Sequence, residues 1–239
     1  MRVVLALQRL PRRLAVLDPA LALARDLDAA VMALFVEDPR LLASAALPVV
    51  REVDHWSGEV RELDRPALER RLAAEAGRVE RALRAAARER AIELSFRVVR
   101  DRPEAAARAA RQGGDIVVVG AFASAADWPG QGMASAALVA AYDDGTDAGA
   151  RAVSAAERLA AAAGRPLMVA SSAPVGTAPP TAPGRRRLTL PEDGLPAFLR
   201  ALSPYDIAAC VVAEAHAVTL SERFRAFGSG RDCLLVYVE

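Results

Sequence analysis

Four residues that follow an apolar run, Asp143 to Thr146, have the clearest potential for chemistry in this sequence. The run Leu138–Tyr142 is typical of a buried strand, and open α/β sheets bind ligands just past the carboxyl ends of their strands. Asp143 could therefore contact a ribose or an adenine, with Gly145 and Thr146 close to a phosphate. The alternative is a polar turn in which Thr146 caps the next helix, a common arrangement at strand ends.

Glycines and arginines supply two further candidates for anion binding. Gly120, Gly130 and Gly132 could form a loop whose backbone N–H groups hold a phosphate, although their spacing favours linker turns instead. The run Arg185–Arg187 could bind a phosphate through its guanidinium groups. A solvated strand entry beside a flexible loop, residues 171–184, explains the same arginines equally well.

Metal binding and nucleophilic catalysis have no support in the residue pattern. The histidines, His55 and His216, have no Cys or His at ligand spacing, so we expect no metal site. No Gly-x-Ser-x-Gly elbow is present, and Ser229 falls in a Gly-Ser-Gly turn. Cys210 and Cys233 lie in apolar runs and are expected in the core; a disulfide would require their strands to be adjacent.

The elements that must position these residues occur twice along the chain. Val3–Leu7, a helix and Val31–Val36 form one strand–helix–strand unit, and Leu138–Tyr142, a helix and Leu167–Ala170 form the other. The two units align without a gap, which predicts parallel strands joined by right-handed helical crossovers. We expect one repeat over residues 1–123, a linker over 124–135 and a second repeat over 136–239.

The rest of the chain adds helices, strands and one irregular segment. Strands are expected at 93–99, 115–120, 206–212 and 233–238, and a long helix from about 66 to 90. Residues 37–66 contain several breakers, an apolar island over Leu41–Val50, and Trp56, which together could form a contact surface for a protein partner. The first half has no obvious fifth strand, so its sheet edge is expected to be covered by the second half or by another chain.

Composition limits the classes of function. The 239 residues are 53% hydrophobic and 26% charged, as in a globular protein with a sizeable core. A net charge of +1 gives no electrostatic reason to expect a nucleic-acid partner. No apolar run reaches the roughly 20 residues needed to cross a bilayer, and the apolar stretch near the N-terminus is too short for a signal peptide. We therefore expect a cytoplasmic protein that does not enter membranes.

Three stretches together resemble the universal stress protein family in a tandem arrangement. They are Val3–Gln8 with the following helix and Ala30–Glu37; Phe96–Arg100 with Pro103–Gly120, ending in Asp-Ile-Val-Val-Val-Gly; and Leu138–Thr146, similar to the family's Val-Asp-Gly-Ser opening. The resemblance implies an α/β fold of two flavodoxin-like (HUP-type, Rossmann-like) repeats with parallel sheets, packed as an internal pseudo-dimer. It also implies that the terminal strand, here 233–238, helps to pair the two halves, and the whole chain could still form a homodimer.

The family's ATP-binding members carry a Gly-x-x-Gly stretch and a later Gly-Ser or Gly-Thr pair after the fourth strand. In the first repeat that stretch begins at Gly120 but has Ala123 at the second glycine position, and the second repeat has Ala213 to His216 instead. The family's aspartate after the first strand is replaced by Gln8 in the first repeat and retained as Asp143 and Asp144 in the second.

Motif loss in both repeats leads to two hypotheses of function. The first is a non-enzymatic, stress-related binding or regulatory protein of the universal stress protein type, without a cofactor. The second is an adenine-nucleotide-binding protein for ATP or AMP, or a weak ATPase, that uses Asp143, Gly145 and Thr146, with Gly120 as a further candidate. The partner is then an unidentified protein or a small nucleotide-like ligand.

Overall fold

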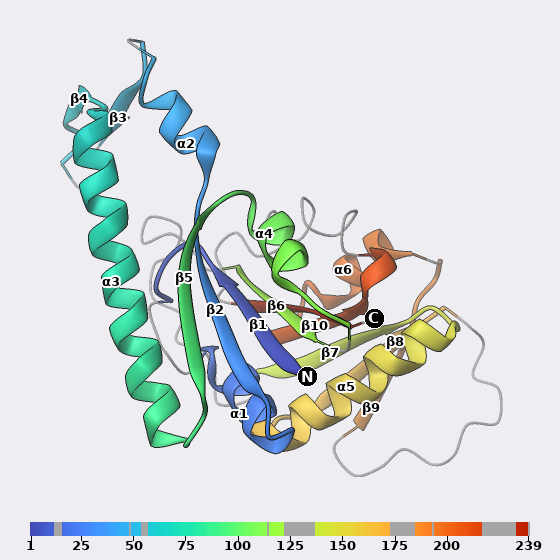
Figure 1. The fold of residues 1–239 in the computed structure, drawn as a ribbon. Coiled ribbons are helices and arrows are strands. Elements are labelled where there is room, and N and C mark those ends of the chain that lie inside the picture. The colour runs from blue at the N-terminus through green and yellow to red at the C-terminus, as the bar shows by residue number, and fades with distance from the viewer. Residues whose placement is uncertain are drawn as a thin grey trace.

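A single mixed sheet with helices on both faces forms the body of the protein (Figure 1). The computed structural model describes residues 1–11, 16–47, 49–53, 57–113, 115–121, 137–172, 185–192, 194–216 and 233–238. The expected α/β class is confirmed, because strands and helices alternate and most neighbouring strands in the sheet are parallel. None of the helices within these residues is both long enough and apolar enough to span a membrane.

The first repeat contributes four parallel strands. Its elements are β1 (Arg2–Leu7), α1 (Asp18–Asp26), β2 (Ala30–Glu37), β5 (Leu94–Arg100), α4 (Pro103–Ala110) and β6 (Ile116–Ala121). The strands lie in the order β5-β2-β1-β6. β1 and β2 are almost wholly buried, which is why both are nearly continuous apolar runs.

The second repeat contributes five parallel strands in the equivalent order. Its elements are β7 (Leu138–Asp143), α5 (Asp147–Ala163), β8 (Leu167–Ser171), β9 (Arg185–Thr189), α6 (Leu195–Leu202), β10 (Ile207–Ala213), the short helix η2 (Glu214–His216) and β11 (Cys233–Val238). The strands lie in the order β9-β8-β7-β10-β11. β7 and β10 therefore occupy the places that β1 and β6 occupy in the first repeat.

One strand joins the two repeats. β11 is parallel to β10 on one side and antiparallel to β6 on the other, with Leu235 opposite Val119. The sheet order is thus β5-β2-β1-β6-β11-β10-β7-β8-β9, and the strands of the two repeats run in opposite directions. Two alternatives were expected for the edge of the first repeat, cover by the second half or by another chain, and the pairing of β11 with β6 bears out the first. The strand is the one that the family resemblance implies.

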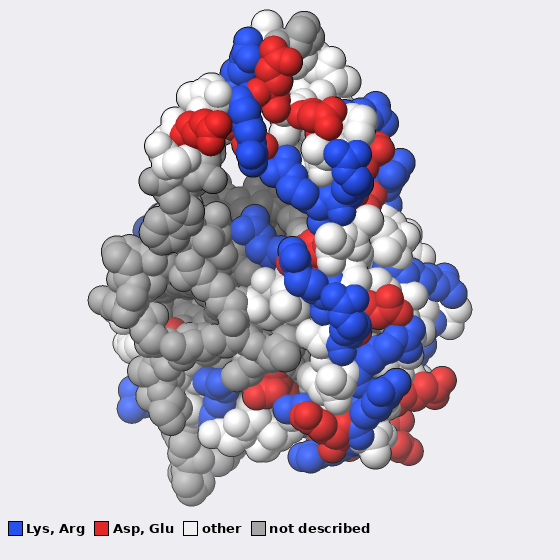
Figure 2. All heavy atoms as spheres, turned by 90° about the vertical axis from the view of Figure 1, so that its left-hand side faces the viewer, with Lys and Arg blue, Asp and Glu red and all other residues white. Residues whose placement is uncertain are grey.

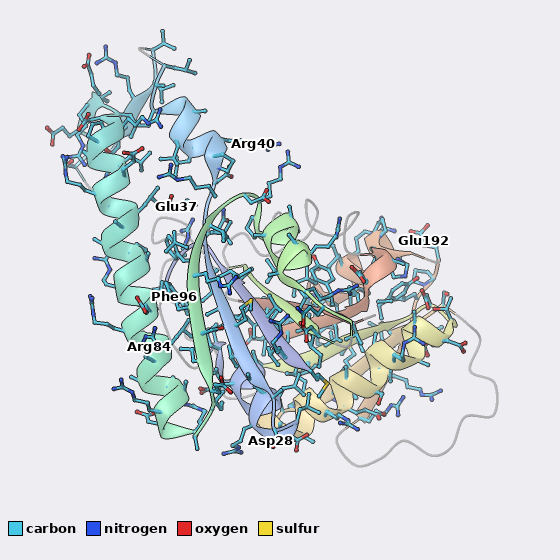
Figure 3. All side chains as sticks on the ribbon, viewed as in Figure 1. Asp28, Glu37, Arg40, Arg84, Phe96 and Glu192 are labelled. Atoms are coloured by element: carbon cyan, nitrogen blue, oxygen red, sulfur yellow. The ribbon has the colours of Figure 1, made fainter. Side chains whose placement is uncertain are left out.

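Helices cover the two faces of this sheet unequally. On one face α1, α5 and α3 (Arg65–Glu89) bury the larger apolar cluster, and α1 packs against α5, the equivalent helix of the other repeat. On the other face α4 and α6 bury a second cluster. Phe96 lies on the α3 side of β5 and packs against the cluster that contains Val79 and Leu83 of α3 (Figure 3). Small alanines at the helix contacts allow this close packing.

An arm projects from the body of the protein (Figure 1). It consists of α2 (Pro39–Ser44), the hairpin of β3 (Arg51–Val53) and β4 (Val60–Glu62), and the amino-terminal part of α3. The irregular segment expected at 37–66 thus contains a short helix and two strands. The arm has its own small apolar cluster, which centres on Leu42, Ala45 and Leu68. Asp54, His55 and Trp56 lie outside the described residues.

The two cysteines lie on adjacent strands but do not face each other. Cys210 of β10 is opposite Leu235 of β11, so Cys233 is displaced by two residues along the strand. The two cysteines do not form a disulfide, and both are buried. They act as small apolar core residues, as the sequence predicts.

Candidate functional site at the strand ends of the second repeat

The turn after β7 is held by its own two aspartates. Oδ1 of Asp143 accepts a hydrogen bond of 3.1 Å from the Gly145 N–H, and Oδ1 of Asp144 accepts one of 3.0 Å from the Thr146 N–H. Gly145 has a φ of +77°, which is in the left-handed region that glycine adopts without strain. Asp143, Gly145 and Thr146, predicted as candidate binding residues, are therefore brought together in one Asx-type turn.

Thr146 caps α5, as the alternative interpretation of the turn predicts. Its Oγ1 accepts a hydrogen bond of 3.0 Å from the Gly149 N–H and donates one of 2.6 Å to Oδ1 of Asp144. Gly149 is required by this packing, because a Cβ atom there would lie 2.3 Å from the same Asp144 oxygen. The first turn of α5 and the Asp144 carboxylate are thus pressed closely together.

His216, at the end of η2, completes the site from the neighbouring strand. Its Nε2 lies 2.7 Å from Oδ2 of Asp144, and both side chains are largely but not fully buried. A carboxylate can only accept a hydrogen bond, so Nε2 carries a proton in this pair. β7 and β10 are neighbours, and their parallel carboxyl ends bring Asp144 and His216 to the same edge of the sheet. This is the position where chain order reverses in the second repeat and where open α/β sheets bind ligands.

Tyr142 fills the space beside this pair. Its ring centroid is 5.4 Å from that of Phe198 in α6 and 5.4 Å, edge-on, from that of His216. Its hydroxyl accepts a hydrogen bond of 2.9 Å from the Gly194 N–H. The tyrosine is buried and joins β7, α6 and η2 into one packed unit.

The electrostatics of the site favour an ionised Asp144. Burial is the largest single influence and raises the pKa of this carboxyl, but the hydrogen bonds from Thr146 and His216 together outweigh it, so the pKa lies below its usual value. Next to it, Glu214 of η2 forms an ion pair with Arg111, which follows α4 of the first repeat. The candidate site therefore lies against an ionic contact between the two repeats.

Gly120 lies elsewhere. Gly120 is opposite Leu234, near the start of β11. Because β6 runs antiparallel to β11, the carboxyl ends of β6 and β7 point to opposite sides of the molecule along the strand direction. Along the strands alone, the separation from Asp143 is about 13 Å, the rise of four residues. Gly120 and the Asp143–Thr146 turn do not form one site. The other loop residues considered, among them Ala123, Gly130, Gly132 and Ser229, lie outside the described residues.

His216 is a site residue that the sequence pattern did not predict. From the sequence, His216 was judged only as a metal ligand, and Asp144, which it contacts, is 72 positions away in the chain. The repeat could have revealed this contact, because the residues that follow the first and fourth strands of such a unit, here β7 and β10, lie side by side. Among the described residues, no group of three His, Cys, Asp or Glu side chains is arranged to hold a metal ion.

Comparison with known proteins gives structural neighbours only. No family model and no curated protein sequence matches the chain. The structure is similar to that of a universal stress protein from Archaeoglobus fulgidus DSM 4304, with 12% identity, 99% of this chain and 96% of that chain covered, and a TM-score of 0.46. It is also similar to a protein of unknown function from Pseudomonas aeruginosa PAO1, with 14% identity, 99% and 92% covered, and a TM-score of 0.45.

A third neighbour is a candidate universal stress protein from Pseudomonas aeruginosa UCBPP-PA14, with 13% identity, 99% of this chain and 93% of that chain covered, and a TM-score of 0.46. The chain is thus similar to universal stress protein structures over nearly its whole length. The α/β assignment itself rests on the strand order and parallel pairing described above.

Proposed function

We propose that this chain is a non-enzymatic, stress-related binding or regulatory protein of the universal stress protein type, built from two repeats that share one terminal strand. The observation that carries the proposal is the engagement of the strand-end groups with one another. Asp143 and Asp144 accept hydrogen bonds from their own turn, Thr146 caps α5, and His216 is held by Asp144. These contacts hold the turn, the start of α5 and η2 together, as is expected of groups that stabilise the fold.

The second candidate is the binding of an adenine nucleotide at the same turn. The position of the turn favours nucleotide binding, because the turn follows β7, where the order of the strands in the sheet reverses. Two features count against it: the Oγ1 of Thr146 is already used twice, and the buried Tyr142 ring fills the space next to His216. Neither repeat carries the glycine-rich stretch that would bring backbone N–H groups to a phosphate. We therefore rank it second.

ATP turnover by the purified protein tests the non-enzymatic part of the proposal. Asp143→Asn is the informative variant, because it removes the charge next to the turn and can still accept the Gly145 hydrogen bond through its amide oxygen. We expect no turnover above background for either protein. Turnover by the wild type that is lost in Asp143→Asn would overturn the proposal in favour of an ATPase.

Protein abundance in the native host tests the stress-related part. We expect the level of the chain to rise when growing cells are starved or exposed to an oxidant, as measured by quantitative mass spectrometry against a constitutive protein. An unchanged level under every stress applied would contradict this part of the proposal.

A further inference from the structure

Exposed apolar side chains are concentrated on the arm. Seven large hydrophobic residues are exposed in the described parts of the chain, and five of them belong to the arm: Leu41, Leu47, Val49, Val53 and Val60. Single exposed apolar residues are ordinary on protein surfaces, but a group on one projecting element indicates a contact surface. The remaining two, Met1 and Val98, lie on the body of the protein.

The two faces of the β3–β4 hairpin have different roles. On the inner face, Glu52 accepts hydrogen bonds of 3.1 Å from Arg61 and from Arg71 of α3, so this face is tied to the long helix. Because side chains alternate along a strand, Arg51, Val53, Val60 and Glu62 share the outer face. Val53 is directly opposite Val60, and their exposed fractions are 58% and 60%. We call these four residues the outer hairpin face.

The charged groups on the outer hairpin face are complementary to those on a second copy of the same face. Arg51 lies opposite Glu62, with Nη1 and Oε1 3.1 Å apart, and both side chains are mostly exposed. One positive and one negative group therefore lie side by side next to the valine pair, two residues along the strands from it. A second copy of the same face, rotated by a half-turn about an axis parallel to the strands, would place its Glu62 against Arg51 and its Arg51 against Glu62. The valines of the two copies would then meet beside the charged groups.

The charge of the whole arm argues against other occupants. The described residues from 38 to 71 carry six arginines and six carboxylates, and Figure 2 shows the two signs interspersed on the arm. A nucleic acid or an anionic membrane requires an excess of positive charge, which the arm does not have. An isologous contact requires a patch that does not repel its own copy, and a neutral mixed patch meets that condition.

We propose that the outer hairpin face is a homodimer contact, in which Arg51, Val53, Val60 and Glu62 of one chain pack against the same residues of a second chain around a two-fold axis. A two-stranded hairpin of three residues a side is marginal in water, so burial of its valines stabilises it. Four residues make a contact that is small beside the roughly 800 Å² that each partner buries in a stable interface, so we expect a weak dimer. The pairing strand β11 is already used inside the chain, so this contact is separate from it.

Sedimentation equilibrium of the full chain tests the contact. We expect a concentration-dependent dimer, and a roughly tenfold or larger increase in its dissociation constant for the double variant Val53→Ser/Val60→Ser, which removes the central apolar pair. The matched control is Val98→Ser, an exposed valine on β5 outside the arm, which should leave the dissociation constant unchanged. Circular dichroism confirms that each variant is folded.

Charge reversal provides the second measurement. Arg51→Glu and Glu62→Arg should each weaken the dimer, because each places like charges across the two-fold axis, and the double variant should restore it. A wild-type chain that is monomeric at concentrations up to about 100 µM would overturn the proposal. So would a dimer that is unaffected by Val53→Ser/Val60→Ser, since its interface must then lie elsewhere.

Discussion

Leu235 of β11 lies opposite Val119 of β6 and, on its other side, opposite Cys210 of β10. The antiparallel pair with Val119 is the seam between the two repeats, and the parallel pair with Cys210 belongs to the second repeat alone. Leu235 therefore belongs both to the parallel pairing within the second repeat and to the antiparallel pairing that joins the two repeats. The fold depends on this strand for both functions.

Leu235→Ala should therefore destabilise the whole protein. Leu235 is 1% exposed, and removing a buried leucine side chain costs about 2–5 kcal/mol of unfolding free energy. Because β11 is shared, we expect a single urea-unfolding transition, monitored by far-ultraviolet circular dichroism and by fluorescence, that moves to lower urea. Val98→Ala, on an exposed site of β5, should change the unfolding free energy by no more than about 0.5 kcal/mol. Two separate transitions, only one of which shifts, would contradict the shared role of β11.

Gly149→Ala should destabilise the protein even though alanine is the better helix former. The new Cβ would lie 2.3 Å from Oδ1 of Asp144, so either α5 or the turn must move, at a cost of about 1–3 kcal/mol. Gly77 in the middle of α3 is the matched control, because its nearest contact would be 3.4 Å away at the flexible end of Arg81. Gly77→Ala should stabilise by about 0.5–1 kcal/mol. Thermal unfolding that shifts in the same direction for both variants would be inconsistent with the close contact at Asp144.

Asp144 should contribute stability that depends on pH. Its pKa is lowered in the folded protein by Thr146 and His216 despite the opposing effect of burial, so its contribution is complete above the unfolded pKa of about 4 and is lost as the pH falls through the lower folded value. We expect the unfolding free energy of the wild type to exceed that of Asp144→Asn at pH 7, and the difference to shrink below about pH 4. Urea titrations from pH 7 to pH 3 measure it. A difference that grows toward acid would show that the sign of the pKa shift is wrong.

Arg186 and Arg187 should protect the edge of the sheet at β9. They lie on β9, which pairs with β8 on one side and forms one end of the sheet order. Charged side chains on an edge strand oppose pairing with other chains. Arg186→Val/Arg187→Val should therefore increase light scattering on incubation at moderate temperature.

The control for the edge-strand prediction is Arg81→Val/Arg88→Val on the exposed side of α3, which makes the same change in charge and adds the same apolar groups away from any edge. Equal scattering by the two double variants would indicate a general solubility effect and would contradict a role for the edge.

Repetition in the sequence predicted the parallel strands of each half, and the family resemblance pointed to the terminal strand as the one that joins the halves. That the two halves form one mixed sheet was not predicted. The apolar runs of β1, β2, β6, β7 and β10 are buried on both faces, which leaves an unambiguous pattern. The short strands of the arm were not predicted, because β3 and β4 are three residues long and carry more charge than apolar character. The arginines of 185–187, interpreted as a solvated strand entry, are themselves part of β9, since an edge strand tolerates charge.

The candidate site was predicted only in part. The turn and its cap follow from local chemistry, because Asp, Gly and Thr after a strand favour an Asx turn and a helix start. The contact of Asp144 with His216 depends on which strands are neighbours, which local patterns do not encode. For the same reason Gly120 was grouped with residues at the other edge of the sheet: the antiparallel relation between the repeats is a property of the assembled fold.

Nucleotide occupancy of the purified chain distinguishes the two proposed functions. Native mass spectrometry of protein purified without added nucleotide, followed by thermal-shift titration with ATP, AMP and cyclic AMP, measures it in two independent ways. We expect a bare protein mass and no rise in melting temperature with any of the three nucleotides. A co-purified nucleotide, or a dose-dependent rise in melting temperature that Asp143→Asn abolishes, would contradict the account and identify the strand-end turn as a nucleotide site.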